Sequence, residues 1–162
     1  MKPIRSAGEK FRFEMDPSEK ALLFHVLQLY PLVPADHHRL SKDRYLANCE
    51  ENQHLLEESL LARRLENRKQ VDTLLNEPGR FKECPGGFRA GFTRGELEWL
   101  LQVLNDVRVG GWLALGSPDE HPEKKEGMSR QTLSHIMTMD VAGFFEMNFL
   151  NAVMGDPHRD DD

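Results

Sequence analysis

The sequence predicts an α+β domain in which four helices predominate and pack with a short two-stranded antiparallel ribbon. Two segments, residues 11–15 and 88–92, alternate apolar residues in the manner of a half-buried strand, and each is followed at once by a helix-start signal. Elsewhere leucine recurs at helical spacing over long stretches. A chain of 162 residues is long enough for one core. We therefore expect a single domain over residues 1–155, followed by a disordered acidic tail over 156–162.

Charge and hydropathy narrow the class of protein. The net charge is −6 and the isoelectric point is near 5.7. This balance argues against nucleic acid and anionic membranes as partners, because both need a basic face. Apolar runs fall short of the roughly 18 residues that a membrane span needs, and the N-terminal residues lack a signal-peptide core. We expect a cytoplasmic protein in which Cys49 and Cys84 are reduced, although a disulfide between them stays open.

The first strand-and-helix unit covers residues 11–30. Apolar and charged residues alternate over 11–15, which predicts a strand. Asp16 then provides an N-cap and Pro17 occupies the first helical position. The helix is expected to end near Tyr30, because prolines follow at positions 31 and 34.

The middle of the chain, residues 42–76, predicts one long helix or two collinear helices. It contains neither proline nor glycine, and leucine, alanine, glutamate and arginine dominate it. Its apolar seam is narrow and too irregular for a sustained heptad repeat. We therefore expect a packed helix with a projecting polar section rather than a coiled coil.

The second strand-and-helix unit is the best-specified part of the chain. After the strand-like segment, Thr93 and Glu96 form a capping box. Leucines follow at helical spacing, and Arg108 falls on the same stripe, which is predicted to be buried. Gly110 and Gly111 would each cost about 1 kcal/mol in a helix interior. The pair therefore predicts a kink, a close helix crossing or an early helix end.

One run in this helix, LNDVR at residues 104–108, stands between an apolar helix and an apolar segment that ends at Leu115. In this setting it resembles the core of an uncharacterised bacterial family of small helical proteins, a domain of unknown function. Actinobacterial members of that family are often encoded beside the adaptor of the Clp protease. The resemblance covers most of the chain and implies a helical fold and a bacterial source. The resemblance implies no particular activity, because none is established for the family. It does lead us to expect a link to regulated proteolysis.

The last helix is predicted to run from the N-cap Ser129 to about residue 154, with Gly155 after its end. Its apolar residues are dense, so we expect it to be the most buried helix. Proline-containing segments at 78–87 and 117–127 are predicted as the loops before the second unit and before this helix.

A polar network is predicted between the central and last helices. Asp140 lies four residues after Ile136 and four before Phe144, on a stripe expected to face inward. A buried carboxylate is costly unless it is paired, and a guanidinium can bind it bidentately, so Arg108 is its natural partner. The network's simplest role is to fix the register of the two helices. Its predicted members are Asn105, Asp106, Arg108, Asp140 and Asn148.

Signals for chemistry are weak in this sequence. It contains no nucleophile elbow, no phosphate-binding loop and no dinucleotide fingerprint. His37, His38, Cys49 and His54 are close in sequence but lack the paired spacing typical of zinc ligands. We therefore predict neither a metal nor a cofactor, and we assign no catalytic residue.

The function class predicted by elimination is a non-catalytic protein–protein interaction or regulatory module. Methionine is abundant in the last helix, and methionine-rich surfaces adapt to partners. Trp99, Trp112 and Met139 are the predicted interface residues, since tryptophan is enriched at interfaces. We expect the partner to be a protein, whose identity the sequence does not give, and a homodimer through the last or the central helix would use these residues.

The alternative is a small enzyme with Asp106, Asp140 and Arg108 as acid–base residues in a cleft between the central and last helices. The two classes make different structural predictions. An enzyme brings these three residues onto a solvent-reachable pocket. An interaction module shows a buried ion pair and an exposed apolar patch.

Overall fold

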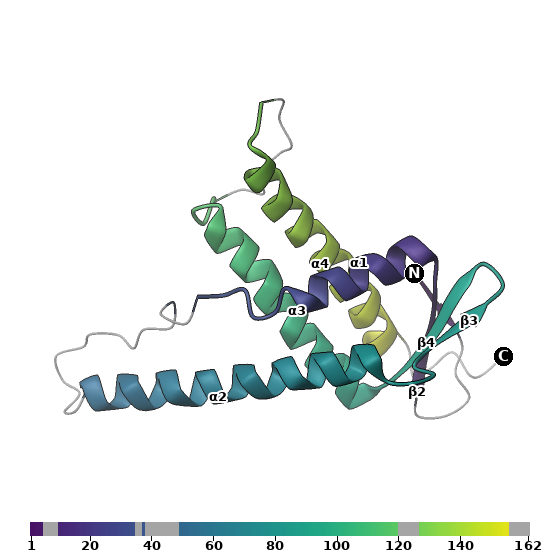
Figure 1. The fold of residues 1–162 in the computed structure, drawn as a ribbon, viewed down its shortest axis with the longest axis horizontal. Coiled ribbons are helices and arrows are strands. Elements are labelled where there is room, and N and C mark those ends of the chain that lie inside the picture. Colours follow the sequence, from purple (N-terminus) through teal and green to yellow (C-terminus); the bar gives the residue numbers. More distant parts are fainter. Residues whose placement is uncertain (5–9, 35–36, 38–48, 120–126, 156–162) are drawn as a thin grey trace.

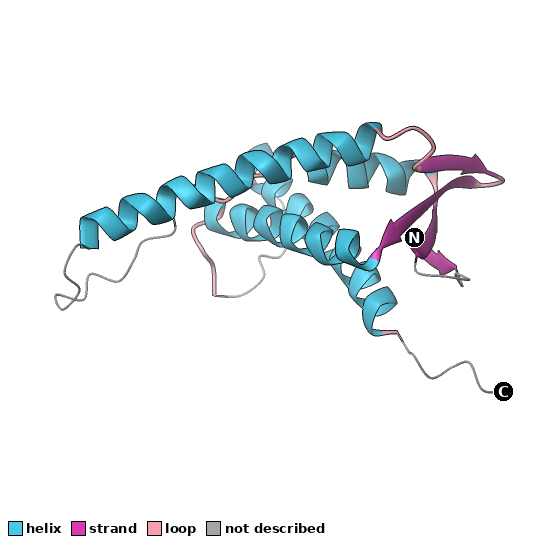
Figure 2. Ribbon diagram, turned by 90° about the horizontal axis from the view of Figure 1, so that it is seen from below, coloured by secondary structure: helices cyan, strands magenta, loops and turns pink. Residues whose placement is uncertain are grey.

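The structure is a computed structural model that describes residues 1–4, 10–34, 37, 49–119 and 127–155. Four helices and one antiparallel sheet make up these ranges, so the predicted α+β class with a helical majority is confirmed. The sheet lies at one end of the helices (Figures 1 and 2). The predicted tail over 156–162 lies outside the described residues. In chain order the elements are β1 (Lys2–Ile4), β2 (Lys10–Met15), α1 (Pro17–Gln28), α2 (Cys49–Asn76), β3 (Phe81–Cys84), β4 (Gly87–Thr93), α3 (Arg94–Ala114) and α4 (Arg130–Met154).

The sheet has four strands where the sequence predicted two. Its order is β1-β2-β4-β3, and every neighbouring pair is antiparallel. The predicted ribbon is the central pair, in which Phe13 lies opposite Ala90 and Met15 opposite Phe88. The two edge strands escaped the sequence reading for different reasons. β1 is only three residues long, and β3 lies in a segment that was interpreted as a proline- and glycine-rich loop.

Both helices that follow a central strand begin at a capping box. Asp16 Oδ1 accepts the backbone N–H of Glu19 at 2.8 Å, and the Glu19 carboxylate accepts the N–H of Asp16 at 2.9 Å. Thr93 and Glu96 make the same reciprocal pair at 3.2 and 2.7 Å. At each cap the strand ends and the helix begins, so the cap fixes the position at which α1 or α3 leaves the sheet.

The core lies between the inner face of the sheet and helices α1, α3 and α4. Phenylalanines from the sheet and from α4 meet there: the centroid of the Phe149 ring lies 5.3 Å from that of Phe13 and 5.8 Å from that of Phe92, in both cases edge-on. All three rings are fully buried. Val71 and Leu74 from the second half of α2 complete this core. The packing of α3 against α4 is the most extensive between helices. The strongly apolar α4 is therefore held by both the sheet side and α3.

Gly110 and Gly111 mark close approaches to α3, which continues past them to Ala114. A Cβ atom at position 110 would lie 2.6 Å from the backbone carbon of Leu32, in the chain that follows α1. At position 111 it would lie 2.9 Å from Cγ of Met139 on α4. The close crossing is thus the observed alternative among the three that the glycine pair predicted.

The long helix α2 is continuous from residue 49, and its first half extends away from the rest of the molecule (Figure 1). Val71 and Leu74 in the second half are buried, whereas Leu55 and Leu61 in the first half are exposed. This agrees with the predicted projecting section. The predicted start near residue 42 lies outside the described residues.

Candidate functional site

A cavity of about 510 Å³ lies between α3 and α4, and four predicted site residues line it. Two of them, Arg108 and Asp140, belong to the predicted polar network. The other two, Trp112 and Met139, belong to the predicted interface. The cavity therefore brings together residues of the predicted polar network and residues of the predicted interface, which were predicted as separate sites. Its full lining is Arg108, Val109, Trp112, Met139, Asp140 and Gly143.

Arg108 makes the ion pair between α3 and α4 with Glu146. Its Nε lies 3.0 Å from Glu146 Oε2, and its Nη2 donates to Asn105 Oδ1 at 3.1 Å. The Arg108 side chain is 49% exposed, so the prediction that it lies on the buried stripe of α3 is wrong. An ionic link between these helices was predicted, but the carboxylate that the structure pairs with Arg108 is six residues further along α4 than Asp140.

Glu146 is the buried acid of α4, with 11% of its side chain exposed. Burial raises the pKa of this carboxyl, and the nearby positive charge of Arg108 offsets only part of the rise. Sequence reasoning missed Glu146 because α4 carries apolar residues on two faces, and the wrong face was taken as the inner one. The buried residues of α4 are Ile136, Met139, Ala142, Phe145, Glu146 and Phe149.

Asp140 is accordingly half-buried at the cavity rather than deep in the core. Two other members of the predicted network make their contacts elsewhere. Asp106 Oδ1 accepts the backbone N–H of Leu32 at 2.8 Å and of Val33 at 3.2 Å, which holds the chain after α1 against α3. Asn148 donates to the carbonyl of Phe144 within α4 at 2.7 Å.

The two tryptophans take different places. Trp99 is half-buried, and its indole N–H donates to Asn67 Oδ1 of α2 at 3.0 Å. It therefore joins α3 to α2. Trp112 is 37% exposed, lines the cavity, and donates to the carbonyl of Pro118 at 3.0 Å. Of the two, Trp112 is the one that a second molecule could contact at the cavity.

A second apolar face of α4 lies in solvent, opposite its buried face. Positions 133, 137, 140, 144, 147, 151 and 154 are separated by four and three residues in turn, the spacing of a heptad seam. Asp140 and Asn151 are the polar exceptions among the seven. The other five are exposed, with Met147 60% accessible. We call these five the α4 stripe: Leu133, Met137, Phe144, Met147 and Met154.

Comparison with protein-family models, with curated proteins and with solved structures finds no match for this chain. The resemblance of residues 104–108 to the bacterial helical family stays a prediction. Across the described ranges, no helix is both long and apolar enough to cross a membrane. Within those same ranges, no group of three or more His, Cys, Asp or Glu side chains is placed to hold a metal ion.

Proposed function

We propose that this protein is a non-catalytic interaction module that associates with a second copy of itself through the α4 stripe. The observation that carries the proposal is the heptad-spaced apolar face on the outside of a helix whose inner face is already in the core. A helix that is apolar on both faces is normally buried on both. The exposed seam runs over 22 residues, about three heptads, which is long enough for a second helix to pack against it.

Charge supports a second copy as the occupant. A net charge of −6 makes copies of the chain repel one another, and a shared surface nearly free of charge adds no local repulsion to this. Six of the seven seam positions are uncharged, and Asp140 is the exception. The seam is therefore a surface that can serve as its own complement, as an isologous two-fold interface requires.

Gly143 supports the same occupant. It lies ten residues after Leu133 and eleven before Met154, beside the seam and midway along its length. A Cβ atom there would meet nothing within 4 Å among the described residues, so the packing of the chain itself does not call for glycine. Glycine allows another backbone to approach closely. Two antiparallel α4 helices related by a two-fold axis would cross near this residue.

The cavity between α3 and α4 opens beside this crossing point, because Gly143 is one of its lining residues. An apolar side chain from the second copy would enter it against Trp112 and Met139. Aromatic and methionine side chains that fill such pockets contribute much of the binding energy of interfaces. In this arrangement the predicted interface residues Trp112 and Met139 act as the socket for the stripe.

The proposal is tested by the mass of the full chain in solution. Sedimentation equilibrium should give twice the 18.7 kDa of one chain for the unaltered protein. Met147→Glu places a charge in the seam and should shift the mass to that of one chain. Leu61→Glu is the matched control, because Leu61 is similarly exposed at 55% but lies on α2. It should leave the mass doubled.

Circular dichroism establishes that the two variants keep their helices, which is expected because both side chains are in solvent. A protein that stays at the mass of one chain over the whole concentration range would overturn the proposal. So would a Met147→Glu variant that associates as the unaltered protein does.

The alternative function is a small enzyme at the same cavity, and the observation in its favour is that Arg108 and Asp140 share a lining with access to solvent. Asp106, the third residue of that hypothesis, is instead engaged with the backbone of Leu32 and Val33. A protein that is monomeric in the sedimentation experiment and retains a small molecule in native mass spectrometry would favour the enzyme.

A further inference from the structure

The outer face of the sheet, opposite the phenylalanine core, carries a cluster of cations. Lys10 and Arg12 lie on β2, Lys82 on β3 and Arg89 on β4. The register places Lys82 directly opposite Arg89. Like charges at opposed positions destabilise a sheet, so this pair is unfavourable for the fold alone. In a chain with a net charge of −6, this face is a local reversal of sign.

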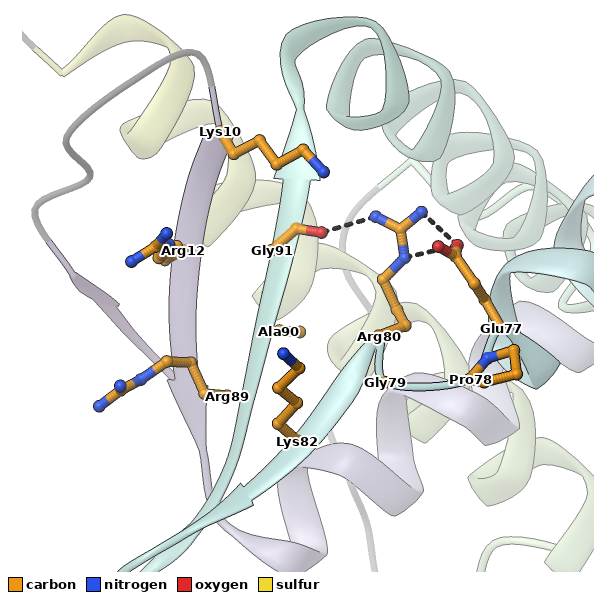
Figure 3. Close-up of a pocket in the computed structure, with 10 residues that line it drawn as sticks. All are labelled: Lys10, Arg12, Glu77, Pro78, Gly79, Arg80, Lys82, Arg89, Ala90 and Gly91. Atoms are coloured by element: carbon orange, nitrogen blue, oxygen red, sulfur yellow. Dashed lines mark hydrogen bonds and ion pairs between the residues drawn. The ribbon is translucent and has the colours of Figure 1, made fainter.

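These four residues are part of the lining of a cavity of about 360 Å³. Figure 3 shows Gly91 in the middle of β4, between Lys10 on one side and the turn that contains Arg80 on the other. The cavity is therefore bounded by the sheet below and by the end of α2 and its turn at the side. Its lining is Lys10, Arg12, Glu77, Pro78, Gly79, Arg80, Lys82, Arg89, Ala90 and Gly91.

Arg80 forms a fixed wall of this cavity. Its guanidinium donates to Glu96 Oε1 at 2.6 Å, to the carbonyl of Gly91 at 2.6 Å, and to Glu77. Burial lowers the pKa of Arg80, but the hydrogen bonds to Glu96 and Glu77 more than offset this, so its pKa is raised. Arg80 thus joins the end of α2, strand β4 and the start of α3.

The other cations of the cavity differ in what holds them. Arg89 pairs with Glu14, its neighbour across the sheet. Lys10, Arg12 and Lys82 have no ion pair with any residue in the part of the chain that the structure describes. Among the described residues, three positive charges therefore line one cavity without an ion pair of their own, because the carboxylate in its lining, Glu77, is bonded to Arg80. A bound anion would remove their mutual repulsion.

Gly91 lines this cavity from the middle of β4. A Cβ atom at position 91 would lie 3.9 Å from Arg12 Cγ, an ordinary contact, so the sheet could hold a larger residue there. Glycine inside a strand weakens the strand and often marks a place where a ligand comes close to the backbone. The packing of the described residues therefore does not require glycine at this position, whereas a side chain there would take up part of the cavity.

We propose that this cavity binds a small, multiply charged oxyanion of the class of organic di- and triphosphates. The three cations that lack an ion pair within the described ranges match a ligand with several negative charges, and a guanidinium such as that of Arg12 can bind phosphate oxygens bidentately. The phenylalanines of the sheet pack on its opposite face, and the described lining contains no aromatic residue. This favours a compact phosphate group over a single-stranded nucleic acid, whose bases stack on aromatic side chains.

The test uses inorganic tripolyphosphate as the probe in isothermal titration calorimetry of the full chain at low ionic strength. One equivalent should bind. Arg12→Gln and Lys82→Gln should each weaken binding by roughly tenfold, because each removes a charged contact. Gly91→Val keeps every charge but fills the cavity, and it should weaken binding to a similar extent. Valine is well suited to a strand, so this variant should fold.

Lys69→Gln on α2 is the matched control, because Lys69 is exposed and its loss changes the net charge equally. It should leave binding unchanged. Equal weakening by Lys69→Gln would overturn the proposal, since it would show a non-specific charge effect. Gly91→Val with unchanged binding would show that the anion lies outside the cavity. Inorganic phosphate that binds as tightly as tripolyphosphate would exclude the multiply charged class.

Discussion

Three glycines inside helices illustrate how one residue type serves different ends. A Cβ atom at Gly110 would collide with the backbone of Leu32, and one at Gly111 would displace the side chain of Met139, so the packing of the chain itself favours glycine at both positions. Gly143 has open space around it within the described structure. An unneeded glycine costs a helix about 1 kcal/mol relative to alanine. At Gly143, alanine would therefore favour the stability of the single chain, whereas glycine would favour the close approach of two chains in the proposed pair.

The variant Gly143→Ala distinguishes the effect of this residue on stability from its effect on self-association. The substitution should raise the free energy of unfolding of the single chain by about 1 kcal/mol, because alanine favours the helix and its methyl group fits. It should also weaken self-association, because two helices can no longer approach as closely. Urea unfolding at low protein concentration measures the first effect, and sedimentation equilibrium measures the second.

Gly95→Ala in the first turn of α3 is the matched control. A Cβ atom at this position likewise meets nothing within 4 Å among the described residues, and Gly95 lies outside the α4 seam. It should change stability without changing association. If Gly143→Ala associates as tightly as the unaltered protein, the two-fold crossing at this residue is wrong.

At the scale of single residues, the sequence predicted those interactions that depend only on residues nearby in the chain. The caps at Asp16 and Thr93 were predictable because each needs only its own first turn. The partner of Arg108 was not, because the choice between Asp140 and Glu146 depends on which face of α4 is turned to the core. Apolar residues on both faces of α4 remove that information from the periodicity.

Among the elements, the central strands and the helices were predictable from alternation and helical spacing. The edge strands β1 and β3 were not, because short strands gain their stability from the strand beside them rather than from their own sequence. The cavities depend on several elements at once. No local pattern placed Lys82 beside Arg89, since that contact arises from the hairpin register.

Helix α2 should be uneven in stability along its length. Its second half is held by buried Val71 and Leu74 and by the Asn67–Trp99 hydrogen bond, whereas the first half is mostly exposed. Helical turns without tertiary packing are marginal in water. Amides of residues 52–62 should therefore exchange with solvent at least about tenfold faster than those of 66–76.

Hydrogen exchange followed by mass spectrometry of overlapping peptides measures this difference, and α3, which is packed along its length, gives the protected reference within the same sample. Equal protection of both halves of α2 would contradict the expectation. It would mean that another surface covers the projecting half in solution.

The buried acid Glu146 makes the stability of the whole molecule depend on pH. Burial raises the pKa of Glu146 despite the charge of Arg108, so the folded chain holds this proton more tightly than the unfolded chain. The free energy of unfolding therefore falls as the pH rises from the ordinary carboxyl pKa through the raised value. Glu146→Gln should remove the cost of ionising a buried carboxyl. The variant should therefore have a higher free energy of unfolding at neutral pH, and that free energy should fall less as the pH rises from acid to neutral.

Glu96 provides the contrast for this measurement. Burial acts to raise its pKa, but hydrogen bonds from Arg80 and Thr93 lower the pKa below its ordinary value. Its contribution to stability is present above the ordinary carboxyl pKa and is lost as the pH falls through the lowered value. Glu96→Gln should accordingly destabilise the chain at neutral pH. Urea unfolding over roughly pH 4 to 8 distinguishes the two signs, and a Glu146→Gln variant less stable than the unaltered protein at neutral pH would contradict the assignment.

On the scale of the whole molecule, the two proposed surfaces use separate parts of the chain. The α4 stripe is apolar and lies on the last helix, while the cationic cavity lies on the outer face of the sheet. The net charge of −6 gives no sign of the cationic cavity, because acidic residues elsewhere in the chain outnumber its cations. Self-association and anion binding can therefore be disturbed one at a time, by Met147→Glu and by Arg12→Gln respectively.

The alternation in the two central strands also bears on how this chain can change in length. Residues opposite one another in β2 and β4 share a face, so Phe11 faces Phe92 while Glu14 faces Arg89. Inserting or deleting one residue within either strand would exchange the two faces beyond that point, turning charges into the core and phenylalanines into solvent. Related sequences should therefore vary in length in the connecting segments, while the spans 10–15 and 87–93 keep a constant number of residues or change it by two.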